Sequence, residues 1–73
     1  MPRSSKKNRM GEIIRAARKR LGMTLDDLVA ETKLGKGNLS ELESGVSRNP
    51  TLSTLRTLSK ALHISIMEII GDE

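Results

Sequence analysis

Lysine and arginine dominate the chemistry that this 73-residue sequence offers, since 13 of its residues are basic and little else is reactive. The only histidine is His63, and cysteine and all three large aromatic residues are absent. A zinc site needs several cysteine or histidine ligands, and acid–base catalysis needs groups that converge on one point. We therefore predict no enzyme, no metal, no cofactor and no small-molecule ligand. We expect His63 to lie at a helix end or on the surface.

The basic residues are concentrated at the N-terminal end. Residues 1–20 carry a net charge of +7 with a single acid, Glu12, whereas residues 21–73 carry −3. This asymmetry indicates a polyanionic partner, either nucleic acid or an anionic membrane surface, although a solubilising tail has the same pattern. Because no aromatic side chain can stack on unpaired bases, double-stranded DNA fits better than RNA or single strands.

The apolar residues indicate five short helices in one domain. They recur at helical spacing over about residues 9–21, 24–32, 36–44, 51–62 and 66–70, and they are Leu, Ile, Met, Val and Ala only. We predict a compact all-α fold of five helices over residues 9–73, preceded by a flexible basic arm over residues 1–8. Two stripes are expected to face the core: Met10, Ile14, Ala17 and Leu21 in the first helix, and Leu52, Leu55, Leu58 and Leu62 in the fourth.

Residues that favour helix ends separate these segments. Gly22 follows the first apolar stretch, where a left-handed residue commonly ends a helix. Thr24 and Thr51 are suited to cap the helices that follow them with their hydroxyl groups. Ser65 and Glu68 have the spacing of a capping box, in which each side chain binds the backbone of the other. The last helix is therefore predicted to start at about residue 66.

Two short helices joined by a tight connection at residues 34–35 form a helix-turn-helix unit, in which the second helix enters the DNA major groove. The sequence resembles the phage lambda/434 repressor and Cro-like family of XRE-type regulators over about residues 10–70. The motifs that carry the resemblance are Ile14-Arg15-x-x-Arg18-Lys19-x-x-Gly22-Met23-Thr24-x-x-x-Leu28, Leu34-Gly35-x-x-x-Leu39-x-x-Leu42-Glu43-x-Gly45-x-x-x-x-Pro50 and Thr54-Leu55-x-x-Leu58-x-x-Ala61-Leu62. The resemblance implies a sequence-specific DNA-binding regulator of transcription. We expect it to be cytoplasmic, associated with the nucleoid of a bacterium or encoded by a phage, and without a membrane partner.

The resemblance also implies roles for individual residues. It implies a structural salt bridge between Arg18 and Glu43, and a bidentate carboxylate is the best partner for an arginine on an apolar helix face. The residues expected to read bases, from the outer face of the third helix, are Lys36, Gly37, Asn38, Ser40 and Glu41. Those expected to hold phosphates, from the arm, the start of the second helix and the loop after the third, are Lys6, Lys7, Arg9, Thr24, Leu25, Ser47, Arg48 and Asn49.

This sequence departs from the family pattern at the helix-turn-helix unit itself. Leu25 stands where a glutamine is frequent, Lys33 where the turn usually has glycine, and Gly35 where a serine cap is usual. Gly37 has no side chain to read a base, and Glu41 repels a polyanion unless a cytosine amino group lies against it. These differences affect the reading surface and leave the predicted fold unchanged.

The last predicted helix is apolar on nearly all sides. One small domain can bury only part of this apolar surface. Our candidates for a homodimer seam are therefore Ile66, Met67, Ile69 and Ile70. Burial of the same residues in the core of a single domain is the alternative. A two-fold dimer would bind two half-sites about 34 Å apart.

Three functions remain open on sequence grounds. The chain fits a stand-alone repressor, Cro-like regulator or restriction–modification controller, and it also fits the DNA-binding domain of a longer repressor. The alternative is an interaction module, such as an antitoxin or a bridging adaptor, that uses the same fold to bind protein. Glu41 and Gly37 favour the interaction module slightly, whereas the basic arm and the loop at residues 47–49 favour DNA.

Overall fold

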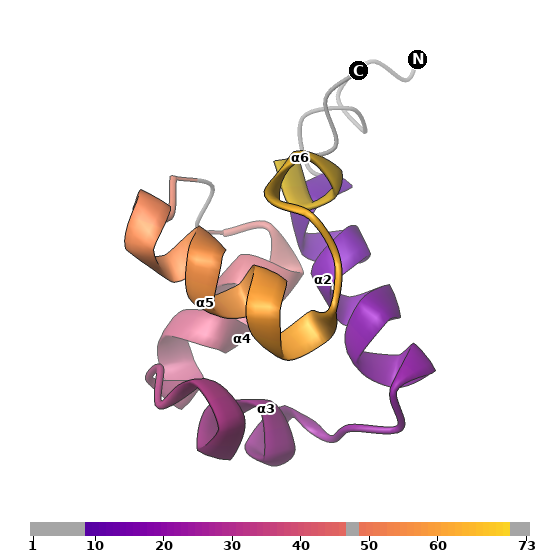
Figure 1. Ribbon diagram of the computed structural model, residues 1–73. Coiled ribbons are helices and arrows are strands. Elements are labelled where there is room, and N and C mark those ends of the chain that lie inside the picture. Colours follow the sequence, from indigo (N-terminus) through magenta and orange to yellow (C-terminus); the bar gives the residue numbers. More distant parts are fainter. Residues whose placement is uncertain (1–8, 47–48, 71–73) are drawn as a thin grey trace, which may run out of the picture.

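The computed structural model describes residues 9–46 and 49–70, which form five helices and no strand. The helices are α2 (Arg9–Arg20), α3 (Leu25–Thr32), α4 (Lys36–Ser44), α5 (Leu52–Leu62) and α6 (Ile66–Ile70) (Figure 1). The predicted all-α architecture and the positions of its helices are confirmed. The predicted arm at residues 1–8 lies outside the described residues. Within the described ranges, no helix is long and apolar enough to cross a membrane.

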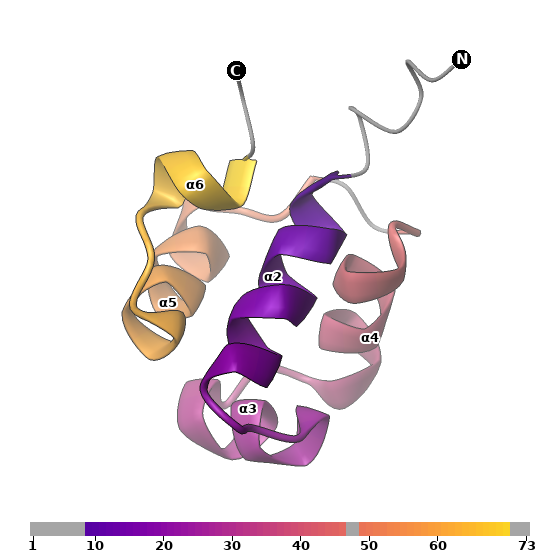
Figure 2. The same cartoon turned by 90° about the vertical axis from the view of Figure 1, so that its right-hand side faces the viewer.

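One apolar core holds the helices together. α2 lies between α4 on one side and α5 and α6 on the other, and α3 lies across one end, against α4 and α5 (Figure 2). Every helix contributes at least one fully or nearly fully buried side chain to this core, which comprises Ile14, Ala17, Leu28, Leu39, Leu42, Leu55, Leu58, Leu62, Ile64 and Ile69. Since no described side chain in the core is aromatic, many small aliphatic contacts provide its stability.

Two residues of the predicted core stripes lie outside the core. Leu21 is 41% exposed because α2 ends at Arg20, so the chain leaves helical geometry before the stripe is complete. Leu52 is 58% exposed because it is the first residue of α5 and has no turn before it to pack against the core. Helical periodicity describes the middle of a helix better than its ends.

Residues in the left-handed backbone conformation follow four of the helices and turn the chain. Gly22 follows α2 with φ 72° and Gly45 follows α4 with φ 88°. Lys33 after α3 and His63 after α5 adopt the same conformation, with φ of 62° and 59°. His63 is thus a helix-terminal residue with an exposed side chain, as the sequence predicted. The strain that a non-glycine residue bears in this region is modest for one position, and the adjoining helix offsets it.

Side-chain caps begin three of the helices. The Thr24 hydroxyl accepts a hydrogen bond from the Asp27 backbone N–H at 3.0 Å, and Asp27 Oδ2 accepts one from the Thr24 N–H at 2.8 Å. The hydrogen bond from the Thr24 backbone holds the pKa of Asp27 below its usual value. Thr51 caps α5 through the Thr54 N–H at 3.1 Å. The reciprocal bonds between residues 65 and 68 confirm the predicted capping box before α6.

A glycine brings α2 and α4 into direct backbone contact. A Cβ atom on Gly11 would lie 2.4 Å from the carbonyl oxygen of Leu42 and 2.6 Å from that of Glu43, both closer than atoms can approach. Gly11 is buried, and its neighbours here are backbone atoms that no rotamer change can move. This contact sets how close the end of α4 lies to α2.

Candidate nucleic-acid interface

α3 and α4 form the helix-turn-helix unit, and a short connection fixes the angle between them. The Thr32 hydroxyl donates to the Leu28 carbonyl at 2.7 Å and accepts from the Leu34 N–H at 3.2 Å. Lys33 then turns the chain in the left-handed conformation, and Gly35 begins α4 with no side-chain cap. Thr32 is nearly fully buried, so its hydroxyl satisfies backbone groups that would otherwise lack partners. The connection is therefore defined by the protein itself.

The outer face of α4 presents polar side chains to solvent. Leu39 and Leu42 lie in the core, whereas the five predicted base-reading residues are exposed: Lys36, Gly37, Asn38, Ser40 and Glu41. A Cβ atom on Gly37 would meet no atom within 4 Å, so a ligand can approach the helix backbone there. The structure thus brings these residues together on one accessible surface. Their contact with bases stays a prediction.

An ion pair between Arg18 on α2 and Glu43 near the end of α4 joins these two helices. Arg18 Nε donates to Glu43 Oε2 at 2.8 Å and Nη2 donates to Oε1 at 3.0 Å, a bidentate arrangement. The two side chains are only 11% and 10% exposed. Hydrogen bonding to the Glu43 carboxylate raises the pKa of Arg18, against the opposing effect of partial burial. The predicted salt bridge is therefore present.

Arg18 also fixes the segment that precedes α3. Its Nη1 donates to the carbonyl oxygen of Met23 at 2.9 Å, between α2 and α3. One guanidinium therefore binds the end of α4 and the start of the helix-turn-helix unit at the same time. Such a fork geometry is available to arginine and not to lysine.

Thr24, a predicted phosphate contact, has its backbone N–H engaged within the protein. Its backbone N–H donates to Asp27 Oδ2, whereas its hydroxyl accepts from the Asp27 N–H and keeps its own proton to donate. The carboxylate of Asp27 occupies the place that a phosphate would take at this N–H. For a backbone N–H the prediction at the start of α3 therefore rests on Leu25, whose side chain is half-buried, and contact through the Thr24 hydroxyl stays a prediction.

Other predicted phosphate contacts fall partly outside the described structure. Lys6, Lys7, Ser47 and Arg48 lie outside the described residues. Arg9 is the first residue of α2. Asn49, after the loop, is exposed. Their contact with phosphate remains a prediction.

The structure adds a residue that sequence reasoning missed. A hollow of about 180 Å³ lies where α2, the start of α3 and α4 meet, and it is lined by Arg15, Leu25, Ser40, Glu43 and Ser44. Arg15 brings an exposed positive charge to this hollow. It lies three residues before Arg18 and therefore on a neighbouring part of the same helix face. That spacing was the signal available in the sequence.

A second ion pair joins the two helices of the unit at the surface. Lys36 Nζ lies 2.9 Å from Asp26 Oδ1, and the two side chains are 61% and 75% exposed. Lys36 is the first residue of α4 and a predicted base reader. This pair could not be predicted from local pattern, because residues on two helices are brought together only by the turn between them.

Comparison with known proteins agrees with this geometry. Residues 14–69 match the helix-turn-helix family, from within α2 to α6. The chain belongs to the helix-turn-helix family. It is also 36% identical over 64 residues to the HTH-type transcriptional regulator SlrR of Bacillus subtilis (strain 168). That match covers 88% of this chain and 42% of the relative, so the chain spans less than half of the relative's length.

Membership of the helix-turn-helix family confirms the resemblance predicted from the sequence. The match is to a helix-turn-helix domain of the Cro/C1 type. The matched span includes both helices of the helix-turn-helix unit and the Arg18–Glu43 pair. DNA is thus the partner that the helix-turn-helix domain implies.

Proposed function

We propose that this helix-turn-helix domain binds double-stranded DNA sequence-specifically, with α4 in the major groove, and represses transcription as a Cro-like regulator does. The observation that carries the proposal is the exposed polar face of α4, together with the Arg18–Glu43 pair that joins α4 to α2. Base reading requires side chains placed with little freedom, and this pair supplies that constraint. A regulator of bacterial or phage promoters acts in the cytoplasm, which is where we place the chain.

The chemistry of the exposed residues assigns each a partner. The Lys36 ammonium suits guanine O6 and N7, and the Asn38 amide suits adenine. Glu41 accepts only from an amino group such as cytosine N4, so it selects against sites that place a phosphate or carbonyl there. Ser40 binds either kind of base edge. Gly37 lets the backbone of α4 approach the groove closely.

Phosphate contacts are proposed around this reading face. The N–H of Leu25 lies at the positive end of the α3 dipole, and Arg15 adds a formal charge at the hollow beside it. From outside the described residues we include Lys6, Lys7, Ser47 and Arg48, and from within them Arg9 and Asn49. These contacts set register and affinity and carry no sequence information.

Binding to random-sequence duplex DNA at several salt concentrations tests the proposal. Each phosphate neutralised adds about −0.9 to the slope of log affinity against log salt concentration. We expect a slope steeper than about −3, which corresponds to several phosphate contacts. Selection from a random pool should then yield a defined site. A flat salt response would contradict DNA binding.

A protein-interaction module is the second candidate function, and one observation favours it. Asp26 on α3 and Glu41 on α4 are both exposed acids on the helix-turn-helix unit, where a DNA phosphate would be repelled. A weak and salt-independent interaction with DNA would support this candidate over the first.

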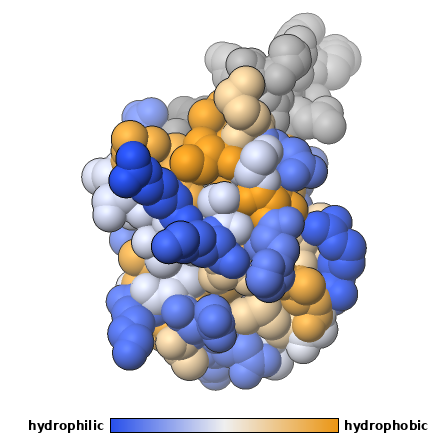
Figure 3. Space-filling view, in the orientation of Figure 1, coloured by the Kyte–Doolittle hydropathy of each residue, from blue (hydrophilic) through white to orange (hydrophobic). Residues whose placement is uncertain are grey.

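We further propose that the domain acts as a homodimer through α5 and α6. Exposed apolar side chains gather there, with Met67 70%, Leu52 58% and Ile70 42% exposed. A groove of about 580 Å³ between the two helices is lined by Leu52 and Ile66 together with Arg56 and Lys60. Orange surface over α6 next to blue side chains over α5 is visible in Figure 3. Exposed apolar area of this kind typically becomes an interface.

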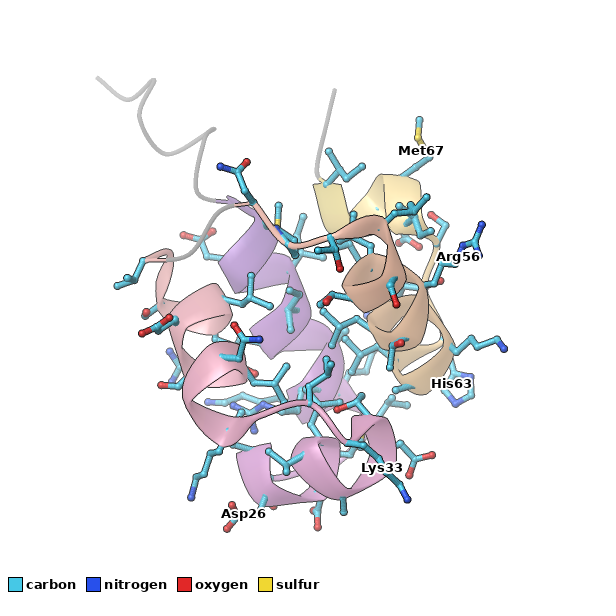
Figure 4. All side chains as sticks on the ribbon, turned by 90° about the vertical axis from the view of Figure 1, so that its left-hand side faces the viewer. Asp26, Lys33, Arg56, His63 and Met67 are labelled. Carbon is cyan, nitrogen blue, oxygen red and sulfur yellow. The ribbon has the colours of Figure 1, made fainter. Side chains whose placement is uncertain are left out.

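Charge complementarity favours a second copy of the chain as the occupant. The groove is basic through Arg56 and Lys60, whereas α6 carries the exposed acid Glu68 beside Met67. Arg56 and Met67 project from the same edge of the molecule in Figure 4. In a two-fold interface the same patch meets itself, so apolar and opposite-charge contacts can form twice.

One predicted dimer residue is excluded from this surface. Ile69 is fully buried in the core of the single domain, where it faces inward from α6. It is therefore a core residue, and the prediction that it forms the dimer seam is wrong. Ile66, Met67 and Ile70 remain as candidates, and Leu52 joins them.

A charged substitution at Met67 tests the dimer without disturbing the core. We expect Met67→Asp to halve the mass seen by sedimentation equilibrium and to leave the helical circular dichroism unchanged. Val46→Asp is the matched control, because Val46 is an apolar residue of similar exposure, 73%, that follows α4 and belongs to neither α5 nor α6. Wild-type protein that sediments as a monomer at every concentration would contradict the dimer.

A further inference from the structure

The surface ion pair between α3 and α4 links a predicted base reader to a carboxylate. Asp26 Oδ1 lies 2.9 Å from Lys36 Nζ. Asp26 is the second residue of α3, and Figure 4 shows it on α3 below α4. Both side chains are more than half exposed, so the pair contributes little to folding stability. Its effect is on where the Lys36 ammonium lies.

An unpaired lysine at this position would weaken discrimination between DNA sequences. The ammonium is a point charge on a flexible four-carbon stem, and it can reach a phosphate as readily as a base edge. Phosphate contacts are the same on every sequence, so they raise affinity for all DNA alike. A lysine that binds phosphate therefore contributes nothing to sequence discrimination.

We propose that Asp26 is a specificity-determining residue that keeps Lys36 from binding phosphate and directs it to a base edge. The carboxylate takes up one of the three ammonium donors and repels any phosphate that approaches from the side of α3. The remaining donors are left for a base acceptor such as guanine N7 or O6. The proposal rests on the proposed DNA-binding function and names how one contact of that interface is selected.

Two features of the structure agree with this role. Asp27, the neighbouring acid, is engaged by Thr24 in the cap of α3, whereas the Asp26 side chain faces Lys36. Asp26 is therefore not part of the capping box, and its negative charge on the proposed DNA-binding surface lowers general affinity. A charge that lowers general affinity raises discrimination if it acts on a reading residue.

The test compares Asp26→Asn with Glu31→Gln, which removes the same charge from an exposed position near the other end of α3. Affinities are measured for random duplex DNA and for a site selected by the wild-type protein. We expect Asp26→Asn to bind random DNA about three- to tenfold more tightly, with a salt slope steeper by about 0.9. The ratio of specific to random affinity should fall by a similar factor. Glu31→Gln should change either affinity less than about twofold.

Two further variants separate positioning from a general charge effect. In a Lys36→Met background, Asp26→Asn should have no larger effect than Glu31→Gln, because no ammonium remains to be directed. Asp26→Glu keeps the carboxylate and should restore discrimination. An Asp26→Asn protein that behaves like Glu31→Gln, or whose effect persists without Lys36, would overturn the inference. If wild-type protein fails to bind DNA with a salt dependence, the proposed function fails instead.

Discussion

Gly11→Ala is expected to destabilise the protein strongly. The added methyl group would lie 2.4 Å from the Leu42 oxygen, 2.6 Å from the Glu43 oxygen and 2.9 Å from the Glu43 carbonyl carbon. All three are backbone atoms of α4, so the clash is relieved only by moving one helix away from the other. We expect a loss of about 3 kcal/mol or more in the free energy of unfolding. A domain of this size has a total on the order of 5–10 kcal/mol.

Gly37→Ala is the matched control for this substitution. Gly37 is also inside a helix, but an added Cβ there meets no atom within 4 Å. Alanine replaces glycine in an exposed helix with a gain of about 0.5–1 kcal/mol. The same chemical change is therefore expected to have opposite signs at the two positions. Urea unfolding followed by circular dichroism measures both, and a Gly11→Ala protein as stable as wild type would contradict the close helix contact.

This pair of glycines shows what the sequence could not predict. Both are single glycines inside helical segments, so the local sequence pattern predicts the same effect of alanine at each. Their difference arises from tertiary packing, because the end of α4 lies against Gly11 and nothing lies against Gly37. The helices themselves were predictable, since periodicity and capping residues such as Thr24 and Ser65 act locally.

At the candidate interface, sequence reasoning predicted which residues of α4 are exposed but missed the contacts that form between helices. Residues that face outward from α4 follow from the spacing of Leu39 and Leu42, so their exposure was predictable. The Asp26–Lys36 pair and the hollow beside Arg15 depend on the angle between helices, which a turn such as the one at Lys33 sets. Buried Ile69 and exposed Met67 lie two positions apart on α6, and only the docking of that short helix distinguishes them.

Loss of either partner of the Arg18–Glu43 pair is expected to destabilise the protein about as strongly as Gly11→Ala. Arg18→Met leaves the Glu43 carboxylate in a site that is 10% exposed, and it removes the hydrogen bond to the Met23 carbonyl as well. A buried charge left without its partner costs about 3–5 kcal/mol. Glu43→Gln should cost less than Arg18→Met, because an amide oxygen still accepts one hydrogen bond from the guanidinium.

Arg20→Met is the control for Arg18→Met, because Arg20 lies on the same helix with an exposed side chain and should change stability by less than about 0.5 kcal/mol. The double substitution Arg18→Met with Glu43→Leu should be less destabilising than the sum of the two single changes, since it removes both charges together. Urea unfolding at low salt and at about 0.5 M NaCl should give the same coupling, because a nearly buried pair is weakly screened. A coupling energy near zero would mean that the two residues act independently.

The same double variant tests whether the Arg18–Glu43 pair contributes to discrimination between DNA sequences. Gly11 meets the backbone of Glu43 and Arg18 binds its side chain, so both contacts fix the end of α4 relative to α2. A double variant that folds without the ion pair retains the residues proposed to bind phosphate and loses the constraint on α4. We expect it to bind random DNA nearly as well as wild type and to discriminate the selected site less well. Unchanged discrimination would show that apolar packing of Leu39 and Leu42 alone positions the reading helix.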